Sequence, residues 1–564
     1  MAFTQRLCRE IIKDHFGPIV ERSSRISPSF AHNSFLQKVA NVLLNKGRLP
    51  CGAIALFAKL TQKQVRECLV VLIQHNIAYY AEIAERSRIV VYYEVSEEEI
   101  LLRIRLGAIL RYSGEWFGKE GALVAQHILR NELVLFTKAF TNMVRERFLV
   151  AVQAQDSISA KDRAINAEAA ELEKLLMPPT AKELKNIRKL RDDRADAEYH
   201  SSVVIGMKRK LAESVGNQAK RHAPEVLEEV EEEFYFRINN DRYNIRFRNE
   251  VIVNYAVDRI NRSAGIVTKT MLDHGEEKMR RTKEDKSPAV TAVQISQLIP
   301  ATINLETDIV LESAEFTANS LPSKQQLVHE YLELLQTDSA GFLRKEDERG
   351  AGLYVVAFDK LRDHLKRKVL DSVVREKYGS ASCRLMKILS EKGKLDEKQV
   401  RAIIVVMVGM SYFTTIVVRM ALATRFVISL ICVQKLALLP AKETRERLAT
   451  LGTQGYLELQ EVPKAADRAP SRTFYLWHVP LNQCYATLLV DLYRTLGNIR
   501  QRKRDEISAR SRLLDKAQRQ DVIENQALLS EEEQEHLRLL NETIAKLDVG
   551  ELRIDGLITI LRDI

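Results

Sequence analysis

Patterns that would hold a metal ion or direct secretion are missing from this sequence of 564 residues. The cysteines form no CxxC pair, and no Cys/His cluster has the spacing of zinc ligands, so we interpret them as reduced and mostly buried thiols. The N-terminus has an amphipathic pattern with charges throughout and lacks the apolar stretch of a secretory signal, which favours an intracellular location. The six cysteines are Cys8, Cys51, Cys68, Cys383, Cys432 and Cys484.

Catalytic motifs are missing as well. The sequence contains no P-loop, no GxSxG nucleophile elbow, no HExxH motif and no Asp-rich triad that would hold the magnesium of a polymerase. Asp347 and the pair Asp359 and Asp363 lie near other charges, which is typical of solvated helix or loop faces. The sequence therefore predicts a protein with no catalytic residues, no cofactor and no metal.

Composition indicates a soluble chain of several domains. Hydrophobic residues make up 46% and charged residues 29% of the sequence, and a prior of roughly 150 residues per domain gives about three to five units. The net charge is +10. Because Lys and Arg release condensed counterions when they neutralise phosphates, this excess favours a polyanionic partner.

Residues 45–95 have the pattern of a winged helix, in which helix, turn, helix and β-ribbon follow one another. Thr61 is the expected N-cap of a helix with Val65 and Leu69 on its inner face. The β-branched and aromatic run 89–95 predicts a strand.

The same order returns near the C-terminus, which indicates duplication. A helix is predicted from residue 441 with Leu448 turned inward, and Gly452 and Gly455 are expected to end it. The two strands expected around a long wing are 456–462 and 472–479.

Weaker versions of the pattern lie between these two, in helical stretches from 101 and 251 and a strand at 352–359, and give four modules. The expected fold is mainly α with small β wings (α+β): tandem winged-helix domains followed by a C-terminal antiparallel coiled-coil hairpin. The expected domains are four winged helices at 1–98, 99–250, 251–370 and 371–480, and a hairpin with a C-terminal docking segment at 481–564.

Residues 155–232 have little apolar periodicity and end in the acidic run EVLEEVEEE. We expect them to be a mobile insertion with some helix in the second module. The KRK at 208–210, followed by Lys220 and Arg221, resembles a bipartite nuclear import signal, and a solvated basic loop explains it equally well.

From residue 481 onward the sequence becomes helical and heptad-like. Two apolar seams are expected to face each other, and Ser530 with Glu533 forms a capping box that marks the restart of the helix. Residues 500–519 carry a basic excess that suits nucleic acid or an acidic partner subunit. The seam residues are candidates for docking a partner: Leu489, Leu492, Leu496, Ile499, Leu537, Leu540, Ile544 and Leu547.

Nine basic residues are candidates for contacts to DNA, because a winged helix can place its second helix in a groove and its wing on the phosphate backbone. Winged helices also dock proteins, and Glu67, Glu443 and Glu446 dilute the basic faces, so both interpretations stay open. The candidates are Lys59, Lys63, Arg66, Lys442, Arg445, Arg447, Lys464, Arg468 and Arg472.

Residues 459–479, with LALLPAKETRERL at 436–448 before them, are similar to the last winged helix of the RNA polymerase III subunit family that leads the enzyme's initiation-specific heterotrimer. The wing PSRTFYLW is specific, and the resemblance spans nearly the whole chain. Further matching stretches are DHFG at 14–17, NKGRLP at 45–50, VLIQHN at 71–76, RYNIRFRNEVIV at 242–253 and KLDVGELRIDGLITIL at 546–561.

The resemblance implies a non-catalytic nuclear subunit of the polymerase that makes transfer RNA, 5S ribosomal RNA and other small RNAs. It implies four winged helices and a C-terminal coiled coil. The partners it implies are the clamp of the largest subunit, two smaller subunits of the heterotrimer, and promoter DNA that the subunit helps to open or retain. No small-molecule substrate and no membrane is expected.

An almost uncharged segment, 401–433, interrupts the last winged helix. Residues 402–419 alone have the composition of a marginal transmembrane span. A membrane anchor, a buried helical insertion and a translated retained intron are the alternatives. We favour the intron, because a span would split a winged helix across a bilayer although both its halves are intact. Residues 23–38 interrupt the first module in the same way.

A free-standing winged-helix transcription factor that binds promoters as a dimer through its helical hairpin is the alternative function. Co-elution with the large polymerase subunits at high salt would support the first interpretation, and salt-sensitive binding of isolated DNA the second. A membrane-tethered regulator is a third possibility that depends on residues 401–433 alone.

Overall fold

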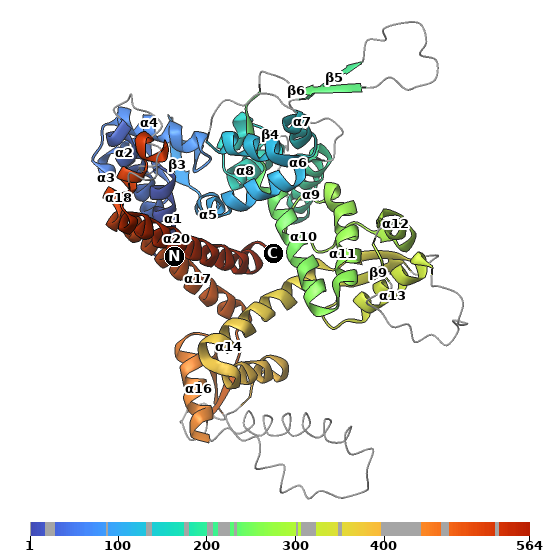
Figure 1. Ribbon diagram of the computed structural model, residues 1–564. Helices are drawn as coiled ribbons and strands as arrows, with labels where there is room; N and C mark the ends of the chain where they lie inside the picture. The colour runs from blue at the N-terminus through green and yellow to red at the C-terminus, as the bar shows by residue number, and fades with distance from the viewer. Residues whose placement is uncertain are drawn as a thin grey trace, which may run out of the picture. The chain divides into compact units, whose positions relative to one another are not determined.

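The computed structural model is mainly helical, with small antiparallel sheets beside the helices (Figure 1). The described residues form two compact units: 1–359 with 496–555 and Asp563, and 360–495 with 556–562 and Ile564. The expected fold class, mainly α with small β elements, is confirmed. The structure describes residues 2–16, 29–85, 88–130, 138–173, 180–199, 207–211, 226–230, 234–300, 303–305, 323–347, 352–395, 441–463, 473–524 and 529–564.

The first winged helix lies in the larger unit. Its three-stranded sheet has the order β1-β3-β2, and β2 pairs antiparallel with β3 from Ala78 opposite Val95 to Glu85 opposite Arg88. The strand expected at 89–95 is therefore one arm of the wing. The elements in chain order are α2 Ser29–Lys46, β1 Leu49–Pro50, α3 Cys51–Ala58, α4 Gln62–Gln74, β2 Ala78–Glu85 and β3 Arg88–Val95.

Local signals fix the turn between α3 and α4. The Thr61 hydroxyl accepts the backbone N–H of Gln64 at 3.4 Å, and the Gln64 side chain accepts the N–H of Thr61 at 3.1 Å, so the predicted N-cap is confirmed. Lys59 ends α3 in the left-handed region with φ 55°. Val65 and Leu72 are buried on the inner face of α4. The side chains of Lys63, Arg66 and Val70 on the outer face of α4 are exposed.

In the second module, helices are followed by two paired strands that flank a long insertion. Gly118 breaks α6 with φ 73°, so that α6 supplies two helices and α7 supplies the third. β4 pairs antiparallel with β7, and residues 152–235 are inserted between them. The elements are α5 Glu97–Leu102, η2 Arg103–Arg105, α6 Leu106–Leu129, α7 Lys138–Arg145, β4 Leu149–Ala151 and β7 Phe236–Ile238.

The insertion contains two helices and a β-ribbon among its described residues. α8 and α9 pack against each other, and Arg188 pairs with Glu168 at 2.9 Å. Arg48 of the first module donates to both carboxylate oxygens of Asp162 at 3.2 and 2.6 Å, which fastens the base of this helix pair. The elements are η3 Ala154–Ser157, α8 Ala160–Leu172, α9 Ala181–Tyr199, β5 Met207–Leu211 and β6 Val226–Val230.

The third module also has a three-stranded sheet, with the order β8-β10-β9. The strand expected at 352–359 is β10, the central strand. Capping boxes at Thr291 and Ser323 start α12 and α13. The elements are α11 Arg262–Gly275, η4 Glu276–Lys278, β8 Val290–Thr291, α12 Ala292–Leu298, α13 Lys324–Thr337, β9 Leu343–Asp347 and β10 Leu353–Val356.

A long helix, α10 Asn240–Arg259, joins the second and third modules and buries arginines. Arg248 is fully buried, and its guanidinium lies 3.8 Å from the ring centroid of Phe358. Arg246 pairs with the carboxylate of Glu276. Because a buried charge is costly without partners, these contacts fix α10 against the third module.

The fourth winged helix forms most of the smaller unit. Leu395 exchanges both backbone hydrogen bonds with Trp477, at 3.1 and 2.8 Å, and so extends the ribbon β11–β12. The prediction that Gly452 ends α16 is wrong: the helix continues to Thr453, and the left-handed Gly455 (φ 78°) follows. A Cβ at Gly452 would lie 3.0 Å from the Trp477 ring, so this glycine makes room for the wing. The elements are α14 Phe358–Lys392, which kinks at Gly379, α16 Ala441–Thr453, β11 Glu458–Pro463 and β12 Thr473–His478.

The two candidate inserts differ in what the structure describes. The apolar segment 401–433 lies outside the described residues. Residues 29–38 of the shorter candidate form the first half of α2, where Leu36 is buried. Among the helices of the described residues, none has both the length and the apolar composition needed to cross a membrane.

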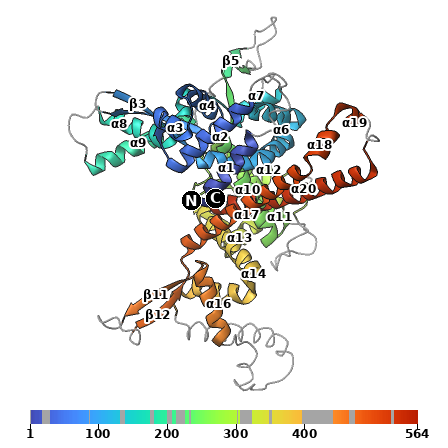
Figure 2. The same cartoon turned by 90° about the vertical axis from the view of Figure 1, so that its left-hand side faces the viewer.

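The C-terminal part forms an antiparallel helical hairpin, with α18 and α19 at its tip (Figure 2). The predicted capping box is confirmed, since Glu533 N–H donates to the Ser530 hydroxyl at 3.2 Å and Ser530 N–H donates to the Glu533 carboxylate at 3.0 Å. The elements are α17 Leu481–Ala509, α18 Ser511–Ala517, α19 Gln520–Glu524, α20 Glu531–Ile558 and the final turn η9 Thr559–Asp563.

Ion pairs between the arms set the register of this hairpin. Ile499 lies against Gly550, with its Cδ1 3.6 Å from the position of a Cβ on that glycine. The two apolar seams therefore do not face each other as expected, because α18 and α19 lengthen the first arm before the chain reverses. Coiled-coil packing along the arms stays a prediction. The bridging pairs are Lys516–Glu533, Lys503–Asp548 and Arg500–Glu551.

A buried arginine ties the C-terminal end of the chain to the second module. Arg105 is 2% exposed and pairs with the carboxylates of Asp555, at 3.4 Å, and Asp563. It also donates to the side-chain oxygen of Asn244 at 2.9 Å. The guanidinium is thus fully surrounded by acceptors from three parts of the sequence.

Substitution of Arg105 by alanine is expected to loosen the end of the chain. Breaking a buried pair leaves uncompensated charge, which costs about 3–5 kcal/mol. Hydrogen exchange of residues 553–564 should show a drop of that size in the free energy of local opening. The control is Arg111→Ala, whose side chain is 60% exposed; there the change should stay below about 0.5 kcal/mol. Equal protection in both variants would contradict the anchoring role.

Candidate nucleic-acid interface

The basic candidates of the first module lie on its solvated side. Lys63 and Arg66 are exposed on the outer face of α4, and Lys59 is exposed just before that helix. Glu67 is exposed beside them. None of the three cations forms an ion pair within the described part of the chain. A phosphate backbone could therefore reach them without displacing an internal partner.

The basic candidates of α16 divide into two kinds. Lys442 and Arg445 are exposed. Arg447 instead pairs with Glu443 at 2.7 Å and donates to the backbone carbonyl oxygen of Tyr378 at 3.1 Å. Arg447 thus holds α16 onto α14. Its role as a DNA contact stays a prediction, and a phosphate would compete with these internal partners.

The corresponding helix of the third module, α13, offers no comparable basic face. Its one lysine, Lys324, donates to the backbone carbonyl oxygen of Ile299. The exposed polar residues along the helix include Gln325, His329 and Glu333. The helix is therefore suited to a protein contact rather than to phosphates.

The wing of the fourth module shows apolar surface in its described part. The basic candidates Lys464, Arg468 and Arg472 lie outside the described residues. The strands beside them leave four large apolar side chains between 38% and 48% exposed. These side chains are Leu459, Val462, Phe474 and Tyr475.

Much of the basic run in the second half of α17 is neutralised by the chain itself. Arg504 pairs with Glu10 and, at 2.8 Å, with Asp14, both on α1 Ala2–His15. Arg500 donates to Glu551 of α20 at 2.9 Å. In the first half of the run, Arg500 and Arg504 thus bind internal carboxylates. The partner expected for the run, nucleic acid or an acidic protein, stays a prediction.

These contacts shift the pKa of Glu10 on α1 and that of Arg504. Partial burial raises the pKa of Glu10, but hydrogen bonds from Arg504 and Lys13 outweigh it and hold the pKa below its ordinary value. The pKa of Arg504 is lowered by burial and raised more strongly by its hydrogen bonds to Asp14 and Glu10. The contact therefore stabilises the fold above the ordinary glutamate pKa and weakens as the pH falls through the lowered value.

Two histidines beside α1 are structural. His15 Nε2 and His75 Nδ1 lie 3.2 Å apart. Burial, with the nearby charge of Arg103, lowers the pKa of His15 to about 3 and that of His75 to about 4, so both rings are neutral at pH 7. Within the described ranges, no group of three or more His, Cys, Asp or Glu side chains could hold a metal ion.

The seam residues proposed to dock a partner are covered by the chain to different degrees. Leu492, Leu496 and Leu540 are buried. The other five, Leu489, Ile499, Leu537, Ile544 and Leu547, are half-buried. Their role in docking a partner stays a prediction.

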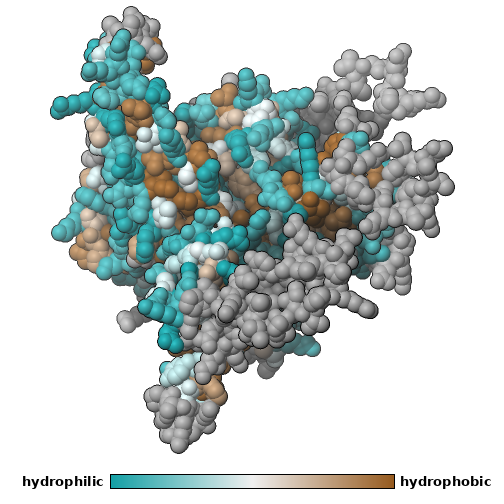
Figure 3. Space-filling model, turned by 60° about the horizontal axis from the view of Figure 1, so that its bottom comes forward, coloured by the Kyte–Doolittle hydropathy of each residue, from teal (hydrophilic) through white to brown (hydrophobic). Residues whose placement is uncertain are grey.

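The sequence pattern did not single out the apolar residues that remain open on α20. Val549 is 47% and Leu552 57% exposed, one helical turn apart. The sequence could have shown them, because Val549 and Leu552 form a second apolar pair on α20 that does not belong to the predicted seam. Apolar surface of this kind lies in patches among hydrophilic surface (Figure 3), which is typical of proteins that bind other proteins.

Comparison with known families gives three matches along the chain. Residues 138–365 match the family of RNA polymerase III subunit RPC82. Residues 34–82 match the helix-turn-helix domain of the same subunit. Residues 417–479 match the C-terminal winged-helix domain of POLR3C. The three matches cover parts of the first, second, third and fourth modules.

Curated relatives match over nearly the full length. DNA-directed RNA polymerase III subunit RPC3 of Danio rerio is 26% identical over 593 residues, covering 99% of this chain and 97% of the relative. The protein of the same name from Homo sapiens is 24% identical, with the same coverage. That of Yarrowia lipolytica is 24% identical and covers 92% of this chain and 94% of the relative.

Two of the family matches begin inside the two candidate inserts, 401–433 and 23–38. The match to the C-terminal winged helix begins at residue 417, so it includes residues 417–433 of the apolar segment. The match to the helix-turn-helix domain begins at residue 34 and includes the end of segment 23–38. The retained-intron interpretation stays a prediction for both segments.

The contact between α1 and α17 can be tested by a double-mutant cycle. Glu10→Ala and Arg504→Ala should show a coupling of up to about 1 kcal/mol in unfolding free energy at pH 7, because the arginine is partly solvated. The coupling should shrink when the cycle is repeated below the ordinary glutamate pKa. The control pair is Glu542→Ala and Lys546→Ala, which is exposed on α20 and 2.7 Å apart. Coupling in the first pair that is independent of pH would contradict the role of the Glu10 carboxylate.

Proposed function

Because this chain belongs to the RPC82 family of RNA polymerase III subunits, we propose that it is a non-catalytic core subunit in the nucleus that scaffolds the initiation subcomplex and assists promoter opening. As a subunit, it works with the other subunits of that polymerase. The proposed contacts are the clamp of the largest subunit, two smaller subunits of the initiation heterotrimer, and promoter DNA.

The distribution of cations supports the DNA role. α4 and α16, the second helices of the first and last winged helices, leave Lys63, Arg66, Lys442 and Arg445 exposed. Arginines of α10 and of the first half of the basic run on α17 are buried or partly buried in ion pairs with internal carboxylates. The cations that remain exposed on α4 and α16 lie where a winged helix presents its recognition helix.

The hairpin supports the scaffold role. Its arms are joined by ion pairs, and its first arm holds α1 through Arg500 and Arg504. The outer face of α20 leaves Val549 and Leu552 exposed. A rigid hairpin with open apolar side chains suits a subunit that holds partners on a larger enzyme.

The two roles can be separated by charge reversal in the assembled polymerase. Lys63→Glu with Arg66→Glu, and separately Lys442→Glu with Arg445→Glu, should reduce promoter opening measured by permanganate reactivity. The log–log slope of DNA binding against salt should fall by about 0.9 for each phosphate that the variant no longer neutralises. Subunit assembly, measured by co-purification, should be unchanged.

The matched control reverses Lys182 and Lys185, two exposed lysines of α9, and should leave promoter opening intact. Lost assembly together with normal promoter opening would refute the DNA role of α4 and α16. Failure of the unmodified chain to co-purify with the large polymerase subunits at high salt would favour a free-standing transcription factor.

A further inference from the structure

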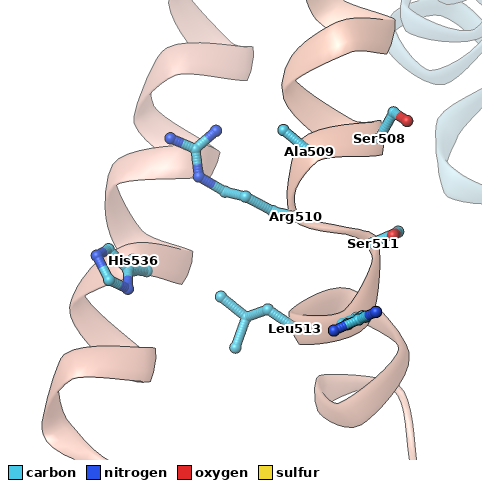
Figure 4. Close-up of a pocket in the computed structure, with 7 residues that line it drawn as sticks. Ser508, Ala509, Arg510, Ser511, Leu513 and His536 are labelled. Atoms are coloured by element: carbon cyan, nitrogen blue, oxygen red, sulfur yellow. The ribbon is translucent and has the colours of Figure 1, made fainter.

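A notch interrupts the hairpin where α17 ends and α18 begins (Figure 4). α17 ends at Ala509, Arg510 leaves the helical conformation with φ −113° and ψ 22°, and α18 begins at Ser511. His536 of α20 lines the opposite wall.

The lining of the notch is cationic and contains no carboxylate. Arg510, Arg512 and His536 supply guanidinium and imidazole groups, and Ser508 supplies a hydroxyl. Arg510 also pairs with Glu506 one turn earlier. Such a set of donors matches carboxylate oxygens.

Arg512 differs from the arginines nearer the start of the same helical arm. Arg500 and Arg504 are bound to internal carboxylates. Arg512 is exposed and forms no ion pair anywhere in the ranges that the structure describes. The charge of Arg512 is therefore available to a partner.

An apolar side chain lies within the same notch. Leu513 is half-buried, and it extends into the gap between the arms toward the side of His536 (Figure 4). Ala509 adds a second apolar group. A phosphate backbone would use the cations and leave these carbon atoms without a contact, whereas a peptide can use both.

We propose that this notch binds an acidic segment of a partner protein, with a carboxylate on Arg512 and an apolar side chain on Leu513. The surface is distinct from the DNA-facing helices α4 and α16, so the proposal does not rest on their role. It assigns a protein partner to the distal half of the basic run, whose proximal half is closed by internal ion pairs. Charge complementarity supplies orientation, and the leucine supplies apolar contact area.

Binding can be measured with the full-length chain and a short fluorescein-labelled peptide of alternating glutamate and leucine. Arg512→Glu should weaken the affinity about tenfold, as expected when a charge-assisted hydrogen bond is removed. The control is Arg553→Glu, which makes the same change of charge at an exposed position of α20 that does not line the notch; it should have an effect of less than about twofold. Equal weakening in the two variants would mean attraction to net charge alone and would overturn the proposal.

Two further variations test the chemistry of the occupant. Leu513→Ser should weaken the glutamate–leucine peptide but not a glutamate–serine peptide, and no difference between the peptides would refute the apolar contact. Single-stranded DNA of similar length should compete poorly. DNA that displaces the peptide from the wild-type chain, but not from Arg512→Glu, would show that the notch binds phosphates instead.

A photo-crosslinker at position 513 in the purified polymerase tests the site in its natural assembly. The captured peptide, identified by mass spectrometry, should be acidic and contain apolar residues. A captured peptide without acidic residues would overturn the proposal, whereas the charge reversals on α4 and α16 would leave this crosslink unchanged.

Discussion

The burial of Arg105 is the constraint on which the arrangement of the larger unit depends. Its guanidinium lies at the end of η2 and is surrounded by Asp555, Asp563 and Asn244. A charge removed from water in this way is tolerated only where its partners are held in place. The second module, α10 and residues 555–563 must therefore assemble together. The hairpin can then act as a rigid arm rather than as a loose tail.

The same requirement divides the basic residues into those that have internal partners and those that are exposed. Arg246 and Arg248 are used to fix α10, and Arg500 and Arg504 are used to hold α1. The net charge of +10 therefore overstates the cationic surface that a partner meets. Exposed cations remain on the outer faces of α4 and α16 and at the tip of the hairpin, and also on α9, where Lys182 and Lys185 are exposed. Different cationic surfaces on one subunit can thus serve different polyanions or acidic partners.

Local signals in the sequence predicted the helices and strands well. Contacts between residues far apart in the sequence could not be predicted from it. Thr61 and Ser530 mark helix starts through hydrogen bonds within four residues, so their sequence spacing is sufficient to recognise them. The register of the hairpin depends on the position at which the chain reverses. The heptad pattern does not predict this position. The internal use of Arg447 and Arg504 was equally hidden, because their partners lie on other elements. A basic residue in a sequence therefore shows its charge but not whether that charge is already neutralised.

The contact between Arg105 and Asp563 spans 458 residues, and that between Arg504 and Asp14 spans 490. During synthesis on the ribosome, the first winged helix and α1 emerge long before the arginines and carboxylates that complete their packing. Both contacts therefore join segments of the larger unit that are synthesised far apart in time. A chain without residues 555–563 would lose both carboxylate partners of Arg105 and leave its buried charge uncompensated.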